Sequence, residues 1–313
     1  MLAAVVEQYG PPEAVGVREV PAPSPTKGRV LVRVHAAAVT SADGRIRAAR
    51  FPRGFGRVAR LAFGVRRPRR PVLGGVFSGV VEEIGPGVEG IAVGDEVCGM
   101  TGARLGTHAE LVVARANRLV VKPSAVTHED AAAVLFGGTT ALHFLRDRVR
   151  PGHRVLVNGA SGAIGTAAVQ LARRAGGHVT GVCSAANADL VRDLGAETVL
   201  DYARTPLESV ADRWDVVLDT VGNVSTPLGR SLLAPGGVLL LAVADLSQTV
   251  RARGDVFAGP APERPEDFRA LLDLVAAGDL RVVVSRTLPL DHIVEAHRLV
   301  DSGRKVGNVV VTP

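Results

Sequence analysis

A glycine-rich turn between an apolar strand and a helix is the stretch whose residue types and spacing most clearly indicate chemistry. Residues 155–157 are typical of a buried parallel strand, and helical apolar spacing runs through residues 166–175. Between them, Gly159, Gly162 and Gly165 permit a tight turn and close approach of the backbone to a ligand. A pyrophosphate would bind where the helix begins, because unpaired N–H groups and the helix dipole favour an anion there. The pattern predicts a dinucleotide site, and glycines that serve packing alone are the alternative.

The next predicted strand ends without a carboxylate. Residues 178–183 have the composition of a strand, and the chain continues as Ser184-Ala185-Ala186-Asn187. In dinucleotide-binding folds an acidic residue at this point accepts the ribose hydroxyls of NAD, whereas a neutral or basic pocket tolerates the 2′-phosphate of NADP. The sequence therefore favours NADPH as the cofactor.

Length and composition indicate a globular protein of two domains. The chain has 313 residues, of which 47% are hydrophobic. It shows neither an export signal nor an 18-residue apolar run, so we expect a cytoplasmic protein with no membrane partner. Two cysteines, Cys98 and Cys183, are too few for a disulfide framework, and we expect both to be reduced and structural.

The formal charge of +6 raises the question of nucleic-acid binding. Ten arginines lie between Arg45 and Arg70, and the aromatic residues among them, Phe51, Phe55 and Phe63, are interpreted as packing residues and not as a platform on which single-stranded bases stack. A solvated basic surface is the favoured interpretation, and nucleic acid is not expected as a partner. The alternative is a nucleotide-binding protein without catalysis that uses this cluster to bind RNA or another acidic partner.

The elements that position these residues fall into two patterns. Up to about residue 121, short apolar runs broken by Gly and Pro predict a small barrel-like β domain. The arginine-rich residues 49–71 interrupt it as a long surface excursion that could contain a short helix. The strands are predicted at 2–6, 30–35, 76–84, 95–99 and 109–113.

Near residues 122–124 the pattern changes to alternating helices and strands, which predicts a domain boundary. Such βα units favour a parallel sheet with right-handed crossovers. The helices are predicted at 127–134, 137–145, 166–175, 188–194, 224–233, 266–276 and 291–301. The strands are predicted at 155–157, 178–183, 198–200, 215–218, 237–243, 281–288 and 308–311.

The order of these parts resembles the medium-chain dehydrogenase/reductase superfamily. A β domain precedes Gly-Gly-Thr-Thr-Ala, the Gly-Ala-Ser-Gly-Ala-Ile-Gly turn, Leu-Asp-Thr-Val-Gly and a Gly-Asn-Val-Val-Val tail. The closest similarity is to the zinc-independent quinone oxidoreductase branch, whose members reduce quinones or activated enones with NADPH and are commonly homodimers. The resemblance implies an α/β protein. A Rossmann doubly wound parallel sheet domain would span residues 125–261, and a GroES-like β-barrel catalytic domain would span residues 1–124 and 262–313.

Zinc is not expected, because the ligands of the zinc-dependent branch are missing. Thr40 stands where the first cysteine ligand would be, and Gly74-Gly75-Val76 replaces Gly-His-Glu. The four-cysteine structural zinc lobe is missing as well. A zinc-type alcohol dehydrogenase is the second enzymatic alternative.

The resemblance also assigns candidate catalytic residues. The family signature Asn-Pro-x-Asp-x-x-x-Arg appears as residues 40–47, with Thr40 in place of the asparagine and with Asp43 and Arg47 matching. Thr40 would donate a hydrogen bond to the substrate carbonyl and stabilise the developing enolate. Asp43 paired with Arg47 would at least hold the turn. Phe51 stands where related enoyl reductases carry a tyrosine, so that proton donor is absent.

The cofactor residues follow from the same resemblance. Ser184 matches a phosphate-contacting position and Tyr202 a residue that packs near the adenosine, although Ser184 could also be a simple helix cap. Asn187 replaces the lysine that family members often carry. The other expected cofactor residues are Thr140, Gly159, Ser161, Gly162, Ala163, Ile164, Gly165, Val221, Ala242 and Asn308.

Overall fold

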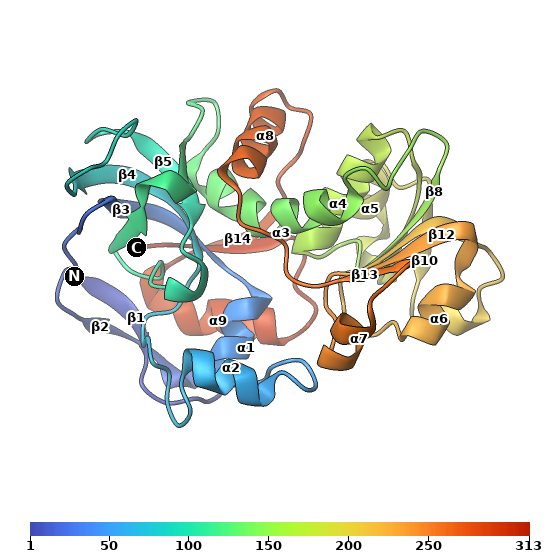
Figure 1. Ribbon diagram of the computed structural model, residues 1–313, viewed down its shortest axis with the longest axis horizontal. Coiled ribbons are helices and arrows are strands. Elements are labelled where there is room, and N and C mark those ends of the chain that lie inside the picture. Colours follow the sequence, from blue (N-terminus) through green and yellow to red (C-terminus); the bar gives the residue numbers. More distant parts are fainter. The chain divides into compact units, whose positions relative to one another are not determined.

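The computed structural model describes residues 1–313 as two compact units (Figure 1). Unit 1 contains Met1–Phe51, Gly56–Phe136 and Glu263–Pro313, and unit 2 contains Pro52–Phe55 and Gly137–Pro262. The change from one unit to the other thus comes later in the chain than the expected boundary after residue 124. The assignment of the two domains to catalysis and cofactor binding stays a prediction.

Unit 1 is built on a seven-stranded sheet. Its strands are β3 (Arg29–Val39), β4 (Val76–Ile84), β5 (Glu96–Met100), β6 (Leu111–Arg115), β7 (Leu119–Val121), β14 (Val284–Pro289) and β15 (Asn308–Thr312). The order is β14-β15-β3-β4-β5-β7, and β6 also pairs with β3. A separate antiparallel pair joins β1 (Leu2–Val6) to β2 (Val15–Glu19). The helices are α1 (Ser41–Ala48), α2 (Gly56–Phe63), α8 (Pro265–Ala276) and α9 (Ile293–Asp301).

The C-terminal segment belongs to this sheet. Strand β15 pairs antiparallel with β3, with Val309 opposite Val39 and Val311 opposite Ala37. Helix α9 covers the sheet with Ile293, Ala296 and Val300, all of which are buried in the same apolar core. The C-terminal residues Glu263–Pro313 therefore belong to unit 1.

Helix α3 (His128–Leu145) replaces two predicted helices. The separate helices at 127–134 and 137–145 were wrong, because Gly137 and Gly138 lie inside a helix whose surroundings override their poor helix propensity. In unit 1, Ala132 and Ala133 pack in one buried cluster with Ala36 and Val310. That packing explains why the first half of the helix belongs to unit 1.

Unit 2 is a doubly wound parallel sheet. Its strands are β8 (Arg154–Asn158), β9 (His178–Cys183), β10 (Thr198–Asp201), β11 (Trp214–Asp219), β12 (Leu233–Leu241) and β13 (Val256–Ala258). The order is β10-β9-β8-β11-β12-β13, with every pairing parallel. The helices besides the second half of α3 are α4 (Ala163–Arg174), α5 (Ala188–Asp193), α6 (Thr226–Ser231) and α7 (Leu246–Arg251). This strand order is that of the Rossmann fold, so the predicted fold class is confirmed.

Burial explains why these residues form a parallel sheet. Residues 155–157 and 216–218 have no exposed surface, as expected for strands covered on both faces. The sequence reading missed five elements: β2, β7, α1, α7 and β13. Each is short or lies in a polar or Gly-containing stretch, where periodicity is weak. No helix is long and apolar enough to cross a membrane.

Candidate functional site

The predicted glycine turn lies at the point of unit 2 where the strand order reverses. Strand β8 has β9 on one side and β11 on the other, and the turn follows its carboxyl end. Gly159 has a φ of 81°, and a Cβ there would lie 2.6 Å from Thr220 Oγ1. The backbone N–H groups of Gly159 and Ala160 both donate to Val182 O, at 3.0 and 2.9 Å. A residue with a side chain could not take the place of Gly159 without displacing the β11 loop.

Helix α4 begins directly after the turn with no side-chain cap. Gly162 occupies the N-cap position, and no side chain accepts a bond from the first turn. Gly165 lets the helix sit against the turn, since a Cβ on it would lie 2.1 Å from Gly159 O. The N–H groups of Ala163 and Ile164 are therefore left for a ligand. A pyrophosphate fits this arrangement, because it supplies both the acceptors and the negative charge that the helix N-terminus favours.

A buried carboxylate fixes the loop after the neighbouring strand. Asp219 ends β11 with no exposed surface and accepts the side-chain amide of Asn158 at 2.8 Å. It also accepts the backbone N–H groups of Val221 at 3.0 Å, of Gly222 at 3.1 Å and of Val224 at 3.2 Å. The sequence reading did not single out Asn158 or Asp219. The signal was present, since each is a polar residue that ends an otherwise apolar strand.

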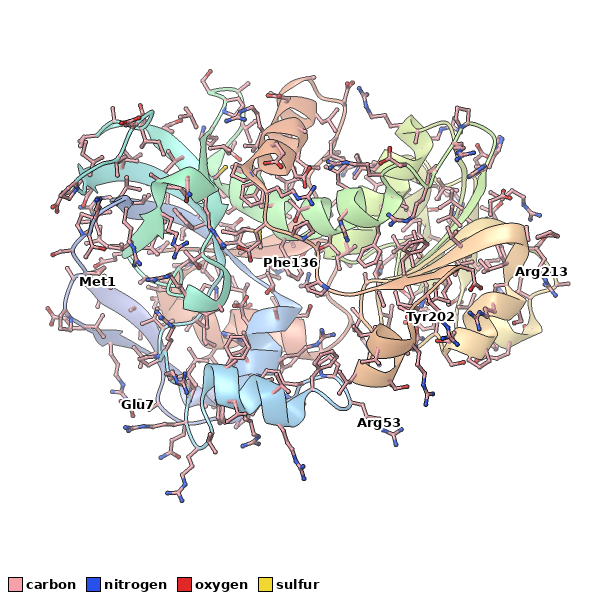
Figure 2. The ribbon with its side chains drawn as sticks, in the orientation of Figure 1. Met1, Glu7, Arg53, Phe136, Tyr202 and Arg213 are labelled. Carbon is pink, nitrogen blue, oxygen red and sulfur yellow. The ribbon has the colours of Figure 1, made fainter.

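The structure brings several predicted adenosine-side residues to one edge of the sheet. Ser184 follows β9, and its side chain makes no cap bond to the short 3-10 turn Ala185–Asn187, so the simple cap interpretation does not hold. Asn187 Nδ2 donates to Ser161 Oγ at 3.1 Å, which joins the end of β9 to the glycine turn. Tyr202 is 54% exposed on the loop after β10 (Figure 2).

Cys183 lies at the same edge as an unreactive thiol. Burial, followed by the negative charge of Asp201, raises the pKa of Cys183. Asp201 ends β10 and accepts the backbone N–H of Ala203 at 3.1 Å. Both cysteines are free, and burial raises the pKa of Cys98 to about 12. The expectation of reduced, structural cysteines agrees with this geometry.

The remaining predicted cofactor residues are more dispersed. Val221, 49% exposed, follows β11, and Ala242 follows β12 with its N–H donating to Asp219 O at 2.9 Å. Thr140 is buried in the part of α3 that belongs to unit 2. Asn308 belongs to unit 1, where its side-chain amide donates to Val283 O at 3.1 Å.

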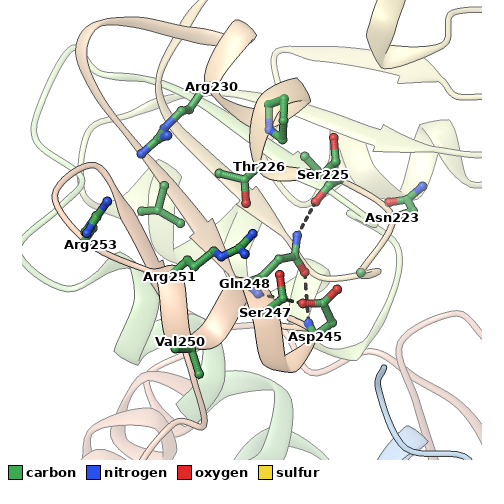
Figure 3. A pocket seen from close by; sticks show the side chains of 14 residues that line it. Asn223, Ser225, Thr226, Arg230, Asp245, Ser247, Gln248, Val250, Arg251 and Arg253 are labelled. Carbon is green, nitrogen blue, oxygen red and sulfur yellow. Dashed lines mark hydrogen bonds between the residues drawn. The ribbon is translucent and has the colours of Figure 1, made fainter. Parts of the chain in front are cut away.

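A cavity of about 1080 Å³ opens beside the loops that follow β11 and β12 (Figure 3). One wall is residues 222–227, which continue from the loop held by Asp219. The other wall is α7, whose N-terminus carries a capping box in which Asp245 Oδ1 accepts the Gln248 N–H at 2.7 Å. Arg251 and Arg253 also line the cavity. The cavity therefore adjoins the predicted nicotinamide side but does not include the glycine turn.

In unit 1, the predicted catalytic residues form the N-terminal cap of α1. Asp43 Oδ2 accepts the backbone N–H of Thr40 at 2.8 Å and its hydroxyl at 2.6 Å. Asp43 Oδ1 accepts the backbone N–H of Gly74 at 3.2 Å. Because the one hydroxyl proton of Thr40 points at a carboxylate, the side chain must rotate before it can donate to a substrate. The donor role of Thr40 stays a prediction.

The expected pairing of Asp43 with Arg47 was wrong. Arg47 is fully buried and donates instead to Asp301 and to Gly10 O, the latter at 2.7 Å. The carboxylate of Asp43 is already used by the cap, so the structural role proposed for it holds with different partners. Arg50 also donates to Asp301, at 2.9 Å.

Gly74, the residue before the missing histidine ligand, is tightly packed, whereas a Cβ on Gly75 at the histidine position itself would meet only Gly102 O, at 4.0 Å. Gly74 has a φ of 88°, and a Cβ on it would lie 2.3 Å from Thr107 Oγ1 and 2.5 Å from the ring of His108. A side chain could not be introduced here without moving the 107–108 loop. No group of three or more His, Cys, Asp or Glu side chains is arranged to hold a metal ion.

Two buried histidines near this loop were missed by the sequence reading. His108 Nε2 donates to Ala38 O at 3.1 Å, and its ring lies 6.1 Å from that of His297. Neither ring nitrogen of His297 has a hydrogen-bond partner. Burial, followed by the charges of His108 and Arg47, lowers the pKa of His297 to about 2. His297 is therefore neutral near pH 7, and nothing in its surrounding sequence distinguishes it from a surface histidine.

Comparison with known proteins places both units in one family. Residues 26–124 match the family described as alcohol dehydrogenase GroES-like domain, and residues 194–311 match the family described as zinc-binding dehydrogenase. The mitochondrial NAD(P)H oxidoreductase RTN4IP1 of Mus musculus is 32% identical over 90% of this chain and 81% of its own length. A quinone oxidoreductase of Pseudomonas aeruginosa is 30% identical over 97% of each chain.

A solved structure agrees with these matches over the full length. The quinone oxidoreductase from Coxiella burnetii superposes with a TM-score of 0.88 at 28% identity and covers 100% of this chain and 99% of its own. The agreement extends over both units, including the C-terminal segment that joins the sheet of unit 1. With its Rossmann strand order and its GroES-like segment, this chain belongs to the medium-chain dehydrogenase/reductase superfamily, in the quinone oxidoreductase-like branch.

Proposed function

We propose that this protein is an NADPH-dependent oxidoreductase that reduces an activated C=C bond, of a quinone or an α,β-unsaturated ketone, without zinc. The observation that carries the proposal is the uncapped start of α4 at the strand-order reversal, next to a strand end without a carboxylate. The names of the relatives support the reaction class, since they are NAD(P)H and quinone oxidoreductases.

The residues of unit 2 would hold the dinucleotide across the carboxyl edge of its sheet. The backbone of residues 159–165 would bind the pyrophosphate, with Ser161 and Gly162 at the closest approach. The loop fixed by Asp219 would carry Val221 against the nicotinamide half. When bound, the nicotinamide supplies a hydride to the electron-poor carbon of the substrate.

The preference for NADPH rests on what surrounds the end of β9. The hydroxyl of Ser184 and the amide of Asn187 are neutral groups that can donate to a phosphate without repelling it. Asn187 is already oriented by its bond to Ser161. A carboxylate at this edge would instead accept the ribose hydroxyls of NADH and repel the 2′-phosphate.

The residues of unit 1 would act on the substrate side. Thr40 would rotate its hydroxyl away from Asp43 and donate to the carbonyl oxygen on which negative charge develops. Asp43 would keep α1 in place through the N–H groups of Thr40 and Gly74. With a phenylalanine at position 51, the product carbon would receive its proton from water.

Zinc independence is part of the proposal, although one matched family is described as zinc-binding. It is supported by Thr40 as the cap of α1 and by Gly75 and Val76, which leave the histidine and glutamate positions of the zinc branch without a metal-binding side chain. Metal analysis of the purified protein tests it directly. One equivalent of tightly bound zinc that is required for turnover would favour the zinc-type alcohol dehydrogenase.

The first experiment is a fluorescence titration of chelator-treated protein with NADPH and with NADH, followed by turnover assays with a quinone and a simple enone. We expect tighter binding of NADPH and metal-independent turnover of at least one acceptor. Binding without turnover across a broad panel would support the non-catalytic alternative. Absence of binding would contradict the assignment of the glycine turn.

A further inference from the structure

Helix α2 presents an apolar stripe to solvent in the middle of the arginine-rich segment. None of its residues is buried. Val58 is 63% exposed and Leu61 66% exposed, one turn apart on the same side, and Val65 just beyond the helix is 56% exposed. Large aliphatic side chains gathered in this way are unusual on a surface that has no partner.

Contacts with neighbouring residues of unit 1 fix the position of α2. Phe63 stacks on Phe51 with ring centroids 5.9 Å apart, and Tyr9 Oη donates to Gly64 O at 2.6 Å. Arg60 lies over the ring of Tyr9 at 5.8 Å and donates to Val65 O at 3.0 Å. The contacts of Arg60, Phe63 and the Gly64 backbone thus hold α2 against the rest of unit 1, and none of them uses the exposed aliphatic side chains.

The charge around the stripe has one sign. Residues 44–81 contain ten arginines and neither Asp nor Glu. Arg47 and Arg50 pair with Asp301, whereas the arginines around the stripe form no ion pair. The exposed ones are Arg57, Arg60, Arg66, Arg67, Arg69 and Arg70, and of these Arg60 lies over the ring of Tyr9. Burial, together with neighbouring guanidinium groups that include that of Arg70, lowers the pKa of Arg104, so the positive surface continues beyond the segment.

We propose that the α2 face, defined as Val58, Leu61 and Val65 with Arg57, Arg66, Arg67, Arg69 and Arg70, docks this protein on an anionic lipid surface. The aliphatic side chains would enter the boundary between headgroups and acyl chains, and the arginines would contact lipid phosphates and carboxylates. The absence of acidic residues from the segment matches the negative potential of such a surface.

A lipid surface fits this face better than RNA does. Single-stranded RNA binding uses exposed aromatic rings for stacking, but Phe55 and Phe63 are partly buried and Phe63 is stacked on Phe51. Three exposed aliphatic side chains would contribute nothing to phosphate contacts. The proposal departs from the expectation of no membrane partner, because the exposure of Val58, Leu61 and Val65 could not be read from the sequence.

The test is co-sedimentation of the full chain with vesicles, in the absence of cofactor and substrate. One set of vesicles is phosphatidylcholine alone, and the other is phosphatidylcholine and phosphatidylserine in equal parts. We expect binding to the anionic vesicles that weakens with rising salt, and little binding to the neutral ones. Equal binding to both sets, or to neither, would overturn the proposal.

Matched variants separate the α2 face from the net charge of the protein. The double variant Arg66→Gln/Arg67→Gln should lower the partition coefficient about 30-fold, from ~1 kcal/mol per basic residue near an anionic surface. Arg269→Gln/Arg304→Gln removes the same charge from exposed positions elsewhere in unit 1 and should have an effect of less than about 3-fold. Similar losses in both double variants would mean unspecific attraction of a basic protein and would overturn the assignment of this face.

A second pair of variants tests the aliphatic stripe. Val58→Glu and Val93→Glu introduce the same charge at valines that are 63% and 60% exposed, so neither should disturb folding. Only Val58→Glu should abolish vesicle binding. If Val58→Glu and Val93→Glu bind the anionic vesicles equally well, the lipid assignment fails. It also fails if single-stranded RNA displaces the protein from the vesicles and Val58→Glu abolishes the binding of that RNA.

A final experiment connects the α2 face to the proposed function, and its interpretation rests on that function. Reduction of a long-chain quinone dissolved in anionic vesicles should fall in Arg66→Gln/Arg67→Gln, whereas reduction of a water-soluble short-chain quinone should not change. If the unaltered protein reduces neither quinone, the proposed function is refuted but the docking proposal is not, because vesicle binding is measured without turnover. Equal rates of the variant and the unaltered protein on the long-chain quinone would count against docking.

Discussion

The side-chain amide of Asn158 donates to the carboxylate of Asp219 at 2.8 Å and so joins the ends of β8 and β11 where the strand order reverses. The glycine turn follows one of these residues, and the loop with Val221 follows the other. Asn158 also donates to Asn223 Oδ1 at 2.7 Å. One buried polar contact therefore positions both loops against which the dinucleotide is proposed to bind.

Asp219→Asn should destabilise unit 2 by about 2–4 kcal/mol, because the new amide N–H₂ would face the backbone donors that the carboxylate now accepts. We also expect weaker NADPH binding, since the loop with Val221 loses its anchor. Urea unfolding and a fluorescence titration measure the two effects. Asp215→Asn is the control: its carboxylate accepts only the exposed N–H of Arg154, so the expected loss is under about 1 kcal/mol. Equal losses in both variants would contradict the special role of Asp219.

Gly165→Ala should prevent the close packing of α4 on the turn. Its Cβ would lie 2.1 Å from Gly159 O and 2.7 Å from Ala160 Cα, both backbone atoms that cannot move aside alone. We expect a loss of about 3 kcal/mol of stability and no measurable NADPH binding. Gly162→Ala is the matched control for stability alone, because its Cβ would meet only Gly159 O, at 3.4 Å, and its φ is negative. A normal melting temperature for Gly165→Ala would show that the turn is looser than described.

Asn187→Lys should raise the affinity for NADPH about ten-fold, because a cation would contact the 2′-phosphate in place of a neutral amide. The affinity for NADH should not rise, since NADH carries no such group. Titrations with both cofactors give the ratio. Ala186→Lys places the same charge on the exposed neighbouring residue and controls for general attraction. Equal gains for NADPH and NADH would place the 2′-phosphate elsewhere.

Two substitutions distinguish the role of Thr40 as the cap of α1 from its proposed role as a hydrogen-bond donor to the substrate. Thr40→Ala removes both the cap of α1, at a cost of about 1 kcal/mol, and the proposed donor, so kcat for an enone should fall about 100-fold. Thr40→Ser keeps the hydroxyl and should retain both stability and kcat. The measurements are thermal unfolding and steady-state kinetics. A fall in stability with unchanged kcat would leave Thr40 as a cap alone.

Much of unit 2 could be predicted from the sequence because its signals are local. A buried parallel strand, a glycine turn and an amphipathic helix follow one another within a few residues, and the structure has β8, Gly159 and α4 in that order. The glycines of the turn could also be interpreted from local geometry alone. Gly159 requires a positive φ, and Gly165 requires contact with its own turn.

The contacts that could not be predicted join residues far apart in the chain. The family signature suggested that Asp43 pairs with Arg47 and holds the turn, but the position of Asp43 in the first turn of α1 makes it part of the helix cap. Arg47 instead pairs with Asp301, which the fold brings to α1 through α9. The exposure of α2 was equally inaccessible, since its apolar residues have the helical spacing of a buried face.

The neutral state of His297 makes stability depend on pH. Its pKa is about 2 in the folded protein and near 6.5 in the unfolded chain, so below pH 6.5 only the unfolded chain gains a proton there. Stability should therefore fall as the pH drops, by about 2–3 kcal/mol between pH 6.5 and pH 4.5 from this residue alone. His297→Phe cannot be protonated and should show a shallower decline in urea unfolding, whereas His292→Phe removes an exposed histidine and should not. If His297→Phe declines as steeply as the unaltered protein over this range, His297 is hydrated and not buried as described.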